Sequence, residues 1–295
     1  MKTIGFIGVG NLGAPMAKNI QNAGYPMVVY DVREGATKPL LEGGARLAAD
    51  PEEVASLSDV TFTSVPGPLE VEEVTLGPHG VLSGIKDGGV YVDLSTSRPS
   101  LIQRIGEMFE TKGATVLDAP VLTSPATAAD RQVVVMPSGD KVVYETLRPI
   151  FESFADKVVY QGSLGMGSAC KLVNNMITLA VRQVVAEGLT LGVKAGLDLN
   201  SLMEAGSRMV LGHQREGLEN TVFRGQYEPP SFRQALARKD IGLANELGRE
   251  LSVPMPVANL VEQISIQIGN RGWGDLDTHV IYQLQEELAG VEIRP

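Results

Sequence analysis

Cysteine is almost absent from the sequence, since Cys170 is the only one. A single thiol forms neither an intrachain disulfide nor a thiolate metal cluster, and it is typical of a protein kept in a reducing compartment. Long apolar runs are also missing: no uncharged run approaches the roughly 20 residues needed to cross a bilayer. The opening MKTIGFIGVG lacks the apolar core of a signal peptide. We therefore expect a cytoplasmic protein without a membrane partner.

Basic side chains are outnumbered, with 25 Lys and Arg against 35 Asp and Glu and a formal net charge of −10. A surface that neutralises the phosphates of a nucleic acid needs the opposite balance, so we expect no nucleic-acid partner. The three histidines, His79, His213 and His279, show no metal-ligand spacing, and no G-x-S-x-G elbow is present. These absences speak against a metallohydrolase and a serine hydrolase, and we expect no bound metal.

The 295 residues are enough for two domains, each with its own core. In residues 1–162, short β-branched runs alternate with helical patterns, which predicts an α/β Rossmann-like doubly wound parallel sheet. Residues 163–295 show helical patterns only, so we expect an all-α second domain, joined to the first by a long buried helix near 167–193. The predicted strands are TIGFIG, MVVYD, DVTFTSVP, GVYVDLS, TVLDAP, QVVVMP and KVVYQG, with helices near 13–23, 51–57, 69–76, 100–112 and 140–154.

A glycine-rich motif stands at the start of the first domain. Gly8, Gly10 and Gly13 follow an apolar strand and open an amphipathic helix in the order G-x-G-x-x-G. The first glycine permits a tight turn, the second lets the backbone approach a pyrophosphate, and the third lets helix and strand pack closely. Asn11 and Leu12 complete the loop. This context predicts a dinucleotide site rather than a structural glycine turn.

The choice of dinucleotide depends on the next predicted strand, which ends in Asp31, eighteen positions after Gly13. A carboxylate there accepts hydrogen bonds from the adenosine ribose and repels a 2′-phosphate, which favours NAD over NADP. Arg33, two residues further on, is able to hold that phosphate instead. NAD is therefore the expected cofactor, and NADP stays open.

Polar residues interrupt the long apolar helix at CKLVNN. Lys171 and Asn175 are four residues apart, which places them on one helical face with Asn174 beside them. A buried lysine needs a partner or loses its proton, and in a hydride-transfer enzyme such a group takes or returns the hydroxyl proton of the substrate. A lysine that snorkels from the first helical turn explains the residues alone equally well. We interpret Cys170 as a small buried residue rather than a nucleophile.

Four blocks of the sequence together resemble the β-hydroxyacid dehydrogenase family, which includes 3-hydroxyisobutyrate dehydrogenase and sulfolactaldehyde reductase. The blocks are GFIGVGNLGAPMAKNI, DAPV at 118–121, GMGSACKLVNN at 165–175 and KDIGLA at 239–244, and the resemblance covers essentially the whole chain. It implies a Rossmann-like domain followed by a helical domain like that of 6-phosphogluconate dehydrogenase. It also implies that Lys171 is the catalytic acid/base and that Asn175 supports it.

The resemblance implies further cofactor contacts. Val65 and Pro66 in SVPGP would border the cofactor, Thr96 in DLSTSRP would lie near the nicotinamide, and Lys239 would reach the cofactor from the helical domain. Relatives often carry a carboxamide or hydroxyl where this chain has Glu70, so one cofactor contact departs from the family pattern.

The block after DAPV departs from the family more strongly. Relatives usually continue with Ser-Gly-Gly, whose hydroxyl and backbone N–H groups hold the substrate carboxylate, whereas this chain has Leu122, Thr123 and Ser124. Either the hydroxyls of Thr123 and Ser124 rebuild the anion site, or that site is absent. We expect these three residues and Asn174 to border the substrate, and a sulfonate or an unusual polyol acid stays open beside a 3-hydroxy carboxylate.

The sequence thus predicts an NAD(P)-dependent dehydrogenase or reductase acting on the CH–OH group of a small, anionic β-hydroxy acid or on its semialdehyde. Two alternatives are an imine reductase, which usually lacks this lysine, and a non-catalytic dinucleotide-binding protein, against which the retained Lys171 and Asn175 speak. Apolar positions in the C-terminal helices predict a homodimer or homotetramer. Trp273, in the loop NRGWGDLD, either packs at a helix start or covers the cleft of a partner subunit.

Overall fold

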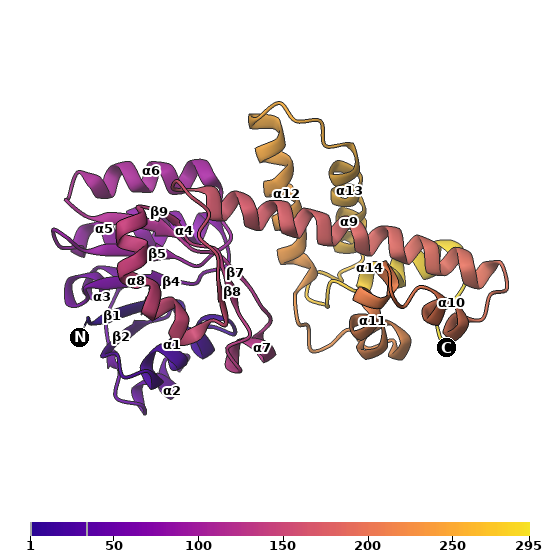
Figure 1. Ribbon diagram of the computed structural model, residues 1–295, viewed down its shortest axis with the longest axis horizontal. Coiled ribbons are helices and arrows are strands. Elements are labelled where there is room, and N and C mark those ends of the chain that lie inside the picture. The colour runs from indigo at the N-terminus through magenta and orange to yellow at the C-terminus, as the bar shows by residue number, and fades with distance from the viewer. Residues whose placement is uncertain (1, 34) are drawn as a thin grey trace. The chain divides into compact units, whose positions relative to one another are not determined.

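The computed structural model of the chain describes residues 2–33 and 35–295. It divides into two compact units, one running to Lys171 and the other from Leu172 to Pro295. Figure 1 shows that the first unit is an α/β fold and that the second is helical. This is the fold class that the alternation of patterns along the sequence predicts.

A seven-stranded sheet organises the first unit. Its strands are β1 (Ile4–Ile7), β2 (Met27–Tyr30), β3 (Arg46–Leu47), β4 (Val60–Thr63), β5 (Val90–Asp93), β6 (Thr115–Asp118) and β9 (Ser138–Gly139). They are arranged in the order β3-β2-β1-β4-β5-β6-β9, and all neighbours are parallel except β9, which runs antiparallel to β6. The strand order reverses beside β1, which pairs with both β2 and β4. In open α/β sheets, ligands bind at this reversal, beside the carboxyl ends of the strands.

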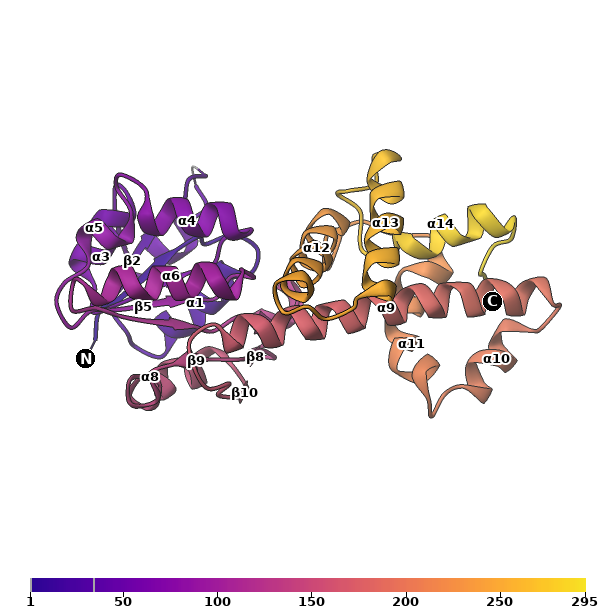
Figure 2. The same ribbon diagram turned by 90° about the horizontal axis from the view of Figure 1, so that it is seen from above.

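Helices cover both faces of this sheet (Figure 2). They are α1 (Gly13–Asn22), α2 (Lys38–Leu41), α3 (Pro51–Leu57), α4 (Pro68–Leu76), α5 (Val81–Gly84), α6 (Pro99–Glu110), α7 (Pro125–Ala129) and α8 (Lys141–Phe154). Neighbouring strand residues point to opposite faces. Phe62 of β4 therefore packs edge-on against Phe151 of α8, whereas Tyr91 of β5 packs on the other face against Phe109 of α6.

A second, small sheet contains two of the predicted strands. It consists of β7 (Val121–Leu122), β8 (Val134–Val135) and β10 (Lys157–Val158), in the order β10-β8-β7. The segments QVVVMP and KVVYQG therefore form strands, as predicted, but not in the large parallel sheet. An apolar β-branched run indicates a strand but does not determine its neighbour, because pairing depends on turn geometry and on the rest of the fold.

The second unit is built from helices around its own apolar core. Its elements are α9 (Met166–Lys194), which begins in the first unit, α10 (Leu199–Ala205), α11 (Val210–Asn220), the 3₁₀ turn η1 (Val222–Arg224), α12 (Gln234–Glu250), α13 (Pro256–Asn270) and α14 (Val280–Ala289). Leu189 of α9, Ile268 of α13 and Tyr282 of α14 are fully buried in this core.

Helix α9 is the long helix that the sequence predicts between the two domains, and within the chain it is buried mainly along one side. Ala186 and Leu189 are buried, but a stripe of apolar side chains at helical spacing is between 50% and 71% exposed. The stripe consists of Val173, Ile177, Val184 and Leu191. An apolar pattern on all faces shows that a helix avoids water, but it does not show whether its own chain or another molecule covers each face.

The length and composition of α9 would also allow it to cross a membrane, with a mean hydropathy of 1.4 over its most apolar window. A core helix of a soluble protein passes the same test, and 39% of this window is buried inside the chain. Lys171 and Arg182 leave only ten uncharged residues between them. That stretch is half of the roughly 20 residues that span a bilayer.

A buried carboxylate joins two loops of the helical unit. Asp277 Oδ2 accepts hydrogen bonds from the backbone N and the hydroxyl of Ser231 at 2.8 and 2.6 Å, and His279 Nδ1 lies 2.6 Å from Oδ1. Burial alone would raise the pKa of Asp277, but the hydrogen bonds from His279 and Ser231 lower it on balance. His279 therefore has a structural partner and supports the loop that precedes α14.

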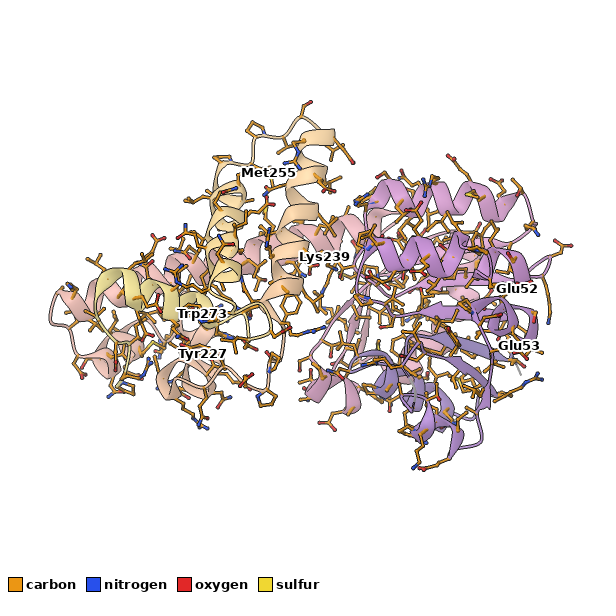
Figure 3. All side chains as sticks on the ribbon, turned by 180° about the vertical axis from the view of Figure 1, so that it is seen from behind. Glu52, Glu53, Tyr227, Lys239, Met255 and Trp273 are labelled. Atoms are coloured by element: carbon orange, nitrogen blue, oxygen red, sulfur yellow. The ribbon has the colours of Figure 1, made fainter. Side chains whose placement is uncertain are left out.

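Trp273 lies in the loop between α13 and α14 (Figure 3). Its ring is partly buried against the apolar core of the helical unit, and the Arg271 guanidinium lies 5.7 Å above the ring centroid. The only tryptophan of the chain thus packs within its own unit.

Candidate active site

The glycine-rich motif forms the turn between β1 and α1. Gly8 has a φ of 85°, and a Cβ at this position would lie 2.4 Å from the Ser64 carbonyl oxygen. A Cβ at Gly13 would lie 2.0 Å from the Gly8 carbonyl oxygen. Both distances are shorter than any side chain allows. The turn therefore requires glycine at position 8, and the contact between helix and strand requires glycine at position 13.

The N-terminal end of α1 opens onto a pocket of about 430 Å³. The pocket is lined by Val9, Gly10, Asn11, Ala14, Arg33 and Ala36. Leu12, the N-cap residue of α1, provides no side-chain hydrogen bond to the first turn. Backbone N–H groups at such a helix start bind anions, phosphates above all. The residues present therefore fit the diphosphate of a dinucleotide.

Asp31 follows β2 and is engaged by Arg33. The backbone N of Arg33 donates to Asp31 Oδ1 at 2.8 Å, and Arg33 Nε donates to the same oxygen at 3.2 Å. The Arg33 side chain is 59% exposed, whereas that of Asp31 is 5% exposed. Arg33 Nη2 lies 2.8 Å from the position that a Cβ at Gly10 would take, so the guanidinium covers the edge of the pocket. The hydrogen bond and the charge of Asp31 raise the pKa of Arg33.

The residues expected near the nicotinamide follow β4 and β5. Val65 donates its backbone N–H to Ser95 Oγ at 3.0 Å, which joins the two loops. A Cβ at Gly8 would lie 3.1 Å from Val65 Cγ1, so Val65 borders the glycine-rich turn. Pro66 is exposed and Thr96 is half-buried in the same loops. These segments meet because the carboxyl ends of β1, β4 and β5 lie side by side.

Lys171 lies in the second turn of α9, where its Nζ donates a hydrogen bond to the Val121 carbonyl oxygen at 2.8 Å. Val121 ends the DAPV block and begins β7. The side chain is partly buried, and its ammonium group is fixed on backbone, unlike that of a lysine that extends into water. A charged donor is thereby held where the segment expected to border the substrate begins.

Asn175 is buried one turn further along α9. Its Nδ2 donates to Asp240 Oδ2 at 2.6 Å, and its Oδ1 accepts from Asn174 Nδ2 at 3.3 Å. Lys239 lies on α12, as Figure 3 shows, and its Nζ is 3.1 Å from the other oxygen of Asp240. One carboxylate, 2% exposed, therefore holds two predicted site residues. Sequence reasoning missed Asp240, although it is the second residue of KDIGLA.

The residues that replace Ser-Gly-Gly form a local helix cap. Ser124 is the N-cap of α7: its Oγ accepts from Thr127 N at 3.3 Å, and Thr127 Oγ1 accepts from Ser124 N at 3.0 Å. Thr123 Oγ1 donates to the Gln132 carbonyl oxygen at 3.0 Å. Leu122 is half-buried at the end of β7. Both hydroxyls are thus engaged within the loop, and they would have to exchange these bonds to hold a substrate anion.

Two buried acids at adjacent strand ends were also missed by sequence reasoning. Asp93 ends β5 and Asp118 ends β6, and the two are register partners. Asp93 Oδ1 accepts from Thr63 Oγ1 at 2.8 Å and from the backbone N of Ser95 at 3.0 Å. Burial raises the pKa of Asp93 to about 6 and also raises that of Asp118. The sequence marks Asp93 only as an acid that closes an apolar strand, whereas Asp118 also begins the DAPV block.

A doubly wound sheet with a glycine-rich anion loop, an acid after the second strand and a fixed lysine defines a nicotinamide-dependent oxidoreductase. Residues 3–162 match the family described as the NAD binding domain of 6-phosphogluconate dehydrogenase. Residues 165–285 match the family described as NAD-binding of NADP-dependent 3-hydroxyisobutyrate dehydrogenase. The chain belongs to the β-hydroxyacid dehydrogenase family, whose members are NAD(P)-dependent enzymes acting on hydroxyl groups.

Individual relatives are similar over nearly their whole length. The 2-(hydroxymethyl)glutarate dehydrogenase of Eubacterium barkeri is 32% identical, over 98% of this chain and 97% of the relative. The mitochondrial 3-hydroxyisobutyrate dehydrogenase of Mus musculus is 31% identical, over 96% of this chain and 87% of the relative. The structure of Mycobacterium tuberculosis 3-hydroxyisobutyrate dehydrogenase with L-serine has a TM-score of 0.88 at 27% identity, over 96% of this chain and 99% of that chain. The predicted family, fold class, enzyme class and nicotinamide cofactor are confirmed.

Proposed function

We propose that the protein transfers hydride between nicotinamide and the carbinol carbon of a small, anionic β-hydroxy acid or its semialdehyde, with Lys171 as general acid/base. The observation that carries this proposal is the hydrogen bond of 2.8 Å from Lys171 Nζ to the Val121 carbonyl oxygen. It fixes a proton-carrying group at the start of the segment proposed to border the substrate. A general acid/base must be held within hydrogen-bond reach of the proton that it moves.

The cofactor supplies the hydride acceptor, and the residues of the chain handle the proton. In the oxidation, the O–H bond of the substrate breaks and its proton passes to neutral Lys171, while the C–H bond delivers hydride and the carbonyl forms. In the reduction, charged Lys171 returns the proton to the alkoxide oxygen. Asn175 is proposed to orient the lysine, and Asp240 holds Asn175 through a hydrogen bond of 2.6 Å.

We assign the cofactor contacts to the glycine-rich loop and to the loops beside it. The diphosphate is proposed to bind the backbone of Gly8, Gly10, Asn11, Leu12 and Gly13, and the adenosine ribose to bind Asp31 with Arg33 beside it. Val65, Pro66 and Thr96 are proposed to lie near the nicotinamide, and Lys239 to contact the cofactor. The uncapped start of α1 and the pocket lined by Gly10 and Asn11 support this assignment.

The substrate is proposed to border Leu122, Thr123, Ser124 and Asn174. The two similar enzymes of E. barkeri and mouse are named for hydroxy acids, which supports a hydroxy acid here. Because hydrogen bonds within the loop engage the Thr123 and Ser124 hydroxyls, the anionic group of the substrate is proposed to displace these bonds or to bind other donors. A sulfonate or a polyol acid therefore stays open beside a 3-hydroxy carboxylate. A panel of hydroxy acids, hydroxy sulfonates and polyol acids, each assayed with NAD and NADP, separates these substrate classes.

Replacement of Lys171 tests the mechanism. In Lys171→Ala we expect dinucleotide binding to persist and kcat to fall by about 10²- to 10⁴-fold, the range for loss of a general acid/base. Steady-state assays and calorimetric titration with NAD measure the two quantities. Lys194→Ala is the matched control, because Lys194 ends the same helix and donates to the Ala289 carbonyl oxygen. Wild-type turnover in Lys171→Ala would refute the mechanism.

We further infer a soluble, cytoplasmic enzyme that forms a homodimer or homotetramer. The single cysteine supports the reducing compartment. The exposed apolar stripe on α9 supports a second copy of the chain as its cover, because a monomer seldom leaves such a row in water. We propose that the functional boundary between the domains lies at residues 162 and 163, and the family matches that end at 162 and begin at 165 support this proposal.

A further inference from the structure

The first turn of α9 receives its caps from the sheet and not from the preceding residues. Backbone N–H groups in a first helical turn have no partner within the helix, and a neighbouring polar side chain usually accepts from them. Here the helix follows Gly165, which has no side chain. Asp118 Oδ1 accepts from Gly165 N at 2.8 Å, and Asp118 Oδ2 accepts from Ser168 N at 2.6 Å. Ser138 Oγ accepts from Gly167 N at 3.0 Å.

The Asp118 carboxylate is completely buried and is hydrogen-bonded at both oxygens. Ser138, at the start of the neighbouring strand β9, also donates its hydroxyl to Asp118 Oδ1. Burial raises the pKa of Asp118, and the hydrogen bonds from Ser138, Gly165 and Ser168 offset part of that rise. A carboxylate at this depth is costly unless it is fully hydrogen-bonded, so its position is specified by its partners.

The two glycines of GMG permit this close approach. Gly165 has a φ of 93°, which favours glycine. A Cβ at Gly167 would lie 2.3 Å from the Met136 carbonyl oxygen and 3.0 Å from Asp118 Oδ2. The blocks DAPV and GMG, which are 47 residues apart in the chain, therefore form the two sides of one contact.

The same two blocks also meet at Lys171. Ser168 and Lys171 are three residues apart on α9, and Val121 at the start of β7 follows Asp118 at the end of β6 by three residues. The backbone of Ser168 is bound to Asp118, and the side chain of Lys171 is bound to the Val121 carbonyl oxygen at 2.8 Å. The start of the helix and the ammonium group are thus tied to one short segment of chain.

We infer that Asp118 is a positioning residue for Lys171: it anchors the first turn of α9 at the end of β6 and so determines where the ammonium group lies. The inference rests on the proposed role of Lys171 in proton transfer. In this arrangement, the acid of DAPV binds the backbone of the helix, and its effect on the reaction passes through Lys171.

Asp118→Asn is the sharpest test. The carboxamide keeps the size of the side chain. It places an N–H donor, however, opposite one of the backbone N–H groups that donate to the carboxylate in the wild type. We expect kcat to fall about 10- to 100-fold, as for a catalytic group displaced by about 1 Å, with the Kd for NAD unchanged. Asp140→Asn is the matched control, because Asp140 caps α8 in the same unit by accepting from Val143 N at 2.8 Å. It should keep the wild-type kcat.

A double variant distinguishes an effect of Asp118 that passes through Lys171 from a loss of turnover that is independent of Lys171. If Asp118 acts through Lys171, adding Asp118→Asn to Lys171→Ala will not lower the residual turnover further. A further 10-fold or larger fall in the double variant, or a wild-type kcat in Asp118→Asn, would overturn the inference and leave the proposed function standing. Wild-type turnover in Lys171→Ala would overturn the proposed function, and the inference with it.

Ser138→Ala provides a second route if Asp118→Asn does not fold. It keeps the carboxylate but removes the hydroxyl that donates to Asp118 and accepts from Gly167. We expect kcat to fall about 3- to 10-fold, less than in Asp118→Asn because the carboxylate itself stays in place, and we expect this fall to vanish in the Lys171→Ala background. A wild-type kcat in Ser138→Ala, or an equal fall in both backgrounds, would contradict the inference.

Discussion

Arg33 lines the glycine-rich pocket and forms an ion pair with Asp31, and each of these two side chains favours a different cofactor. The carboxylate suits the ribose hydroxyls of NAD, whereas the guanidinium suits the 2′-phosphate of NADP. Asp31 already accepts from Arg33 Nε at 3.2 Å, so an incoming ribose must share the carboxylate with the guanidinium or displace it. We therefore expect NAD to be preferred and NADP to be used measurably.

Two substitutions separate these contributions. In Arg33→Ala, kcat/KM with NADP should fall about 10- to 100-fold, since a hydrogen bond to a charged group contributes about 1.5–3 kcal/mol, while use of NAD is unchanged or improved. In Asp31→Asn, the preference should shift toward NADP. Arg46→Ala, which removes another exposed arginine of the same unit, is the control. Equal losses with both cofactors in Arg33→Ala would contradict the assignment.

Asp93 makes the stability of the chain depend on pH. It is completely buried, and its Oδ2 accepts no hydrogen bond from the described residues. Burial raises its pKa from 3.8 to about 6, so the folded chain holds the proton more tightly than the unfolded chain. The free energy of unfolding should therefore fall as the pH rises from about 4 to 6 and stay lower above pH 6. The full difference corresponds to about 3 kcal/mol.

Asp93→Asn removes this ionisation. The free energy of unfolding of the variant, relative to the wild type, should rise by roughly 1 to 2 kcal/mol between pH 5 and pH 8. Chemical denaturation at the two pH values measures it. Asp59→Asn is the control, because Asp59 is exposed. A difference between Asp93→Asn and the wild type that does not change with pH would contradict the argument.

The candidate site residues differ in how much the sequence reveals about them. Gly8 and Gly13 follow from spacing, because the turn and the helix contact are local. Lys171 stands out because a charge interrupts an apolar helix. Asp118 and Asp240 lie in blocks that the resemblance points to, but their contacts could not be predicted, since their partners lie 47 and 65 residues away in the chain and the pairing arises only from the fold.

Elements with a clear periodicity were predicted to within a few residues. Helix α8 was expected near 140–154 and covers Lys141–Phe154, since Asp140 caps it and its apolar residues recur at helical spacing. Short elements were missed. Helix α7 has five residues, too few to show a period, and it forms because Ser124 and Thr127 cap its start.

The capping box at α7 bears on substrate choice. Ser124 and Thr127 satisfy each other's hydrogen-bonding groups, so the loop after DAPV has a stable form of its own. The sequence shows that Ser-Gly-Gly is missing, but not that its replacements form a cap. Because the hydroxyls of Thr123 and Ser124 are both hydrogen-bonded within the loop, the substrate anion has to displace these bonds or bind other donors of the site.

The apolar stripe on α9 concerns the whole molecule. Val184 and Leu191 are 63% and 71% exposed in the single chain and lie seven residues apart on one side of the helix. The stripe was already apolar in the sequence, but only the fold shows that the chain leaves it uncovered. A second copy of the chain is the proposed cover.

Charge on the stripe should separate the subunits. Val184→Asp and Leu191→Asp each place an unpaired charge in the proposed interface, and the dimer Kd should rise at least about 100-fold. Sedimentation at several protein concentrations measures this. Val142→Asp is the control, since Val142 is a 76% exposed apolar residue on α8. A wild-type that sediments as a monomer at all concentrations would refute the proposed interface.

The attachment of α9 to Asp118 and Ser138 has a consequence for the order of folding. The first-turn N–H groups of α9 find their acceptors only when β6 and β9 have paired, because those acceptors lie at the ends of these two strands. Residues 118 and 138 leave the ribosome before 166–194, so β6 and β9 have the opportunity to pair before the helix emerges. The long helix is therefore expected to nucleate on the finished edge of the sheet and to grow from there toward the C-terminus.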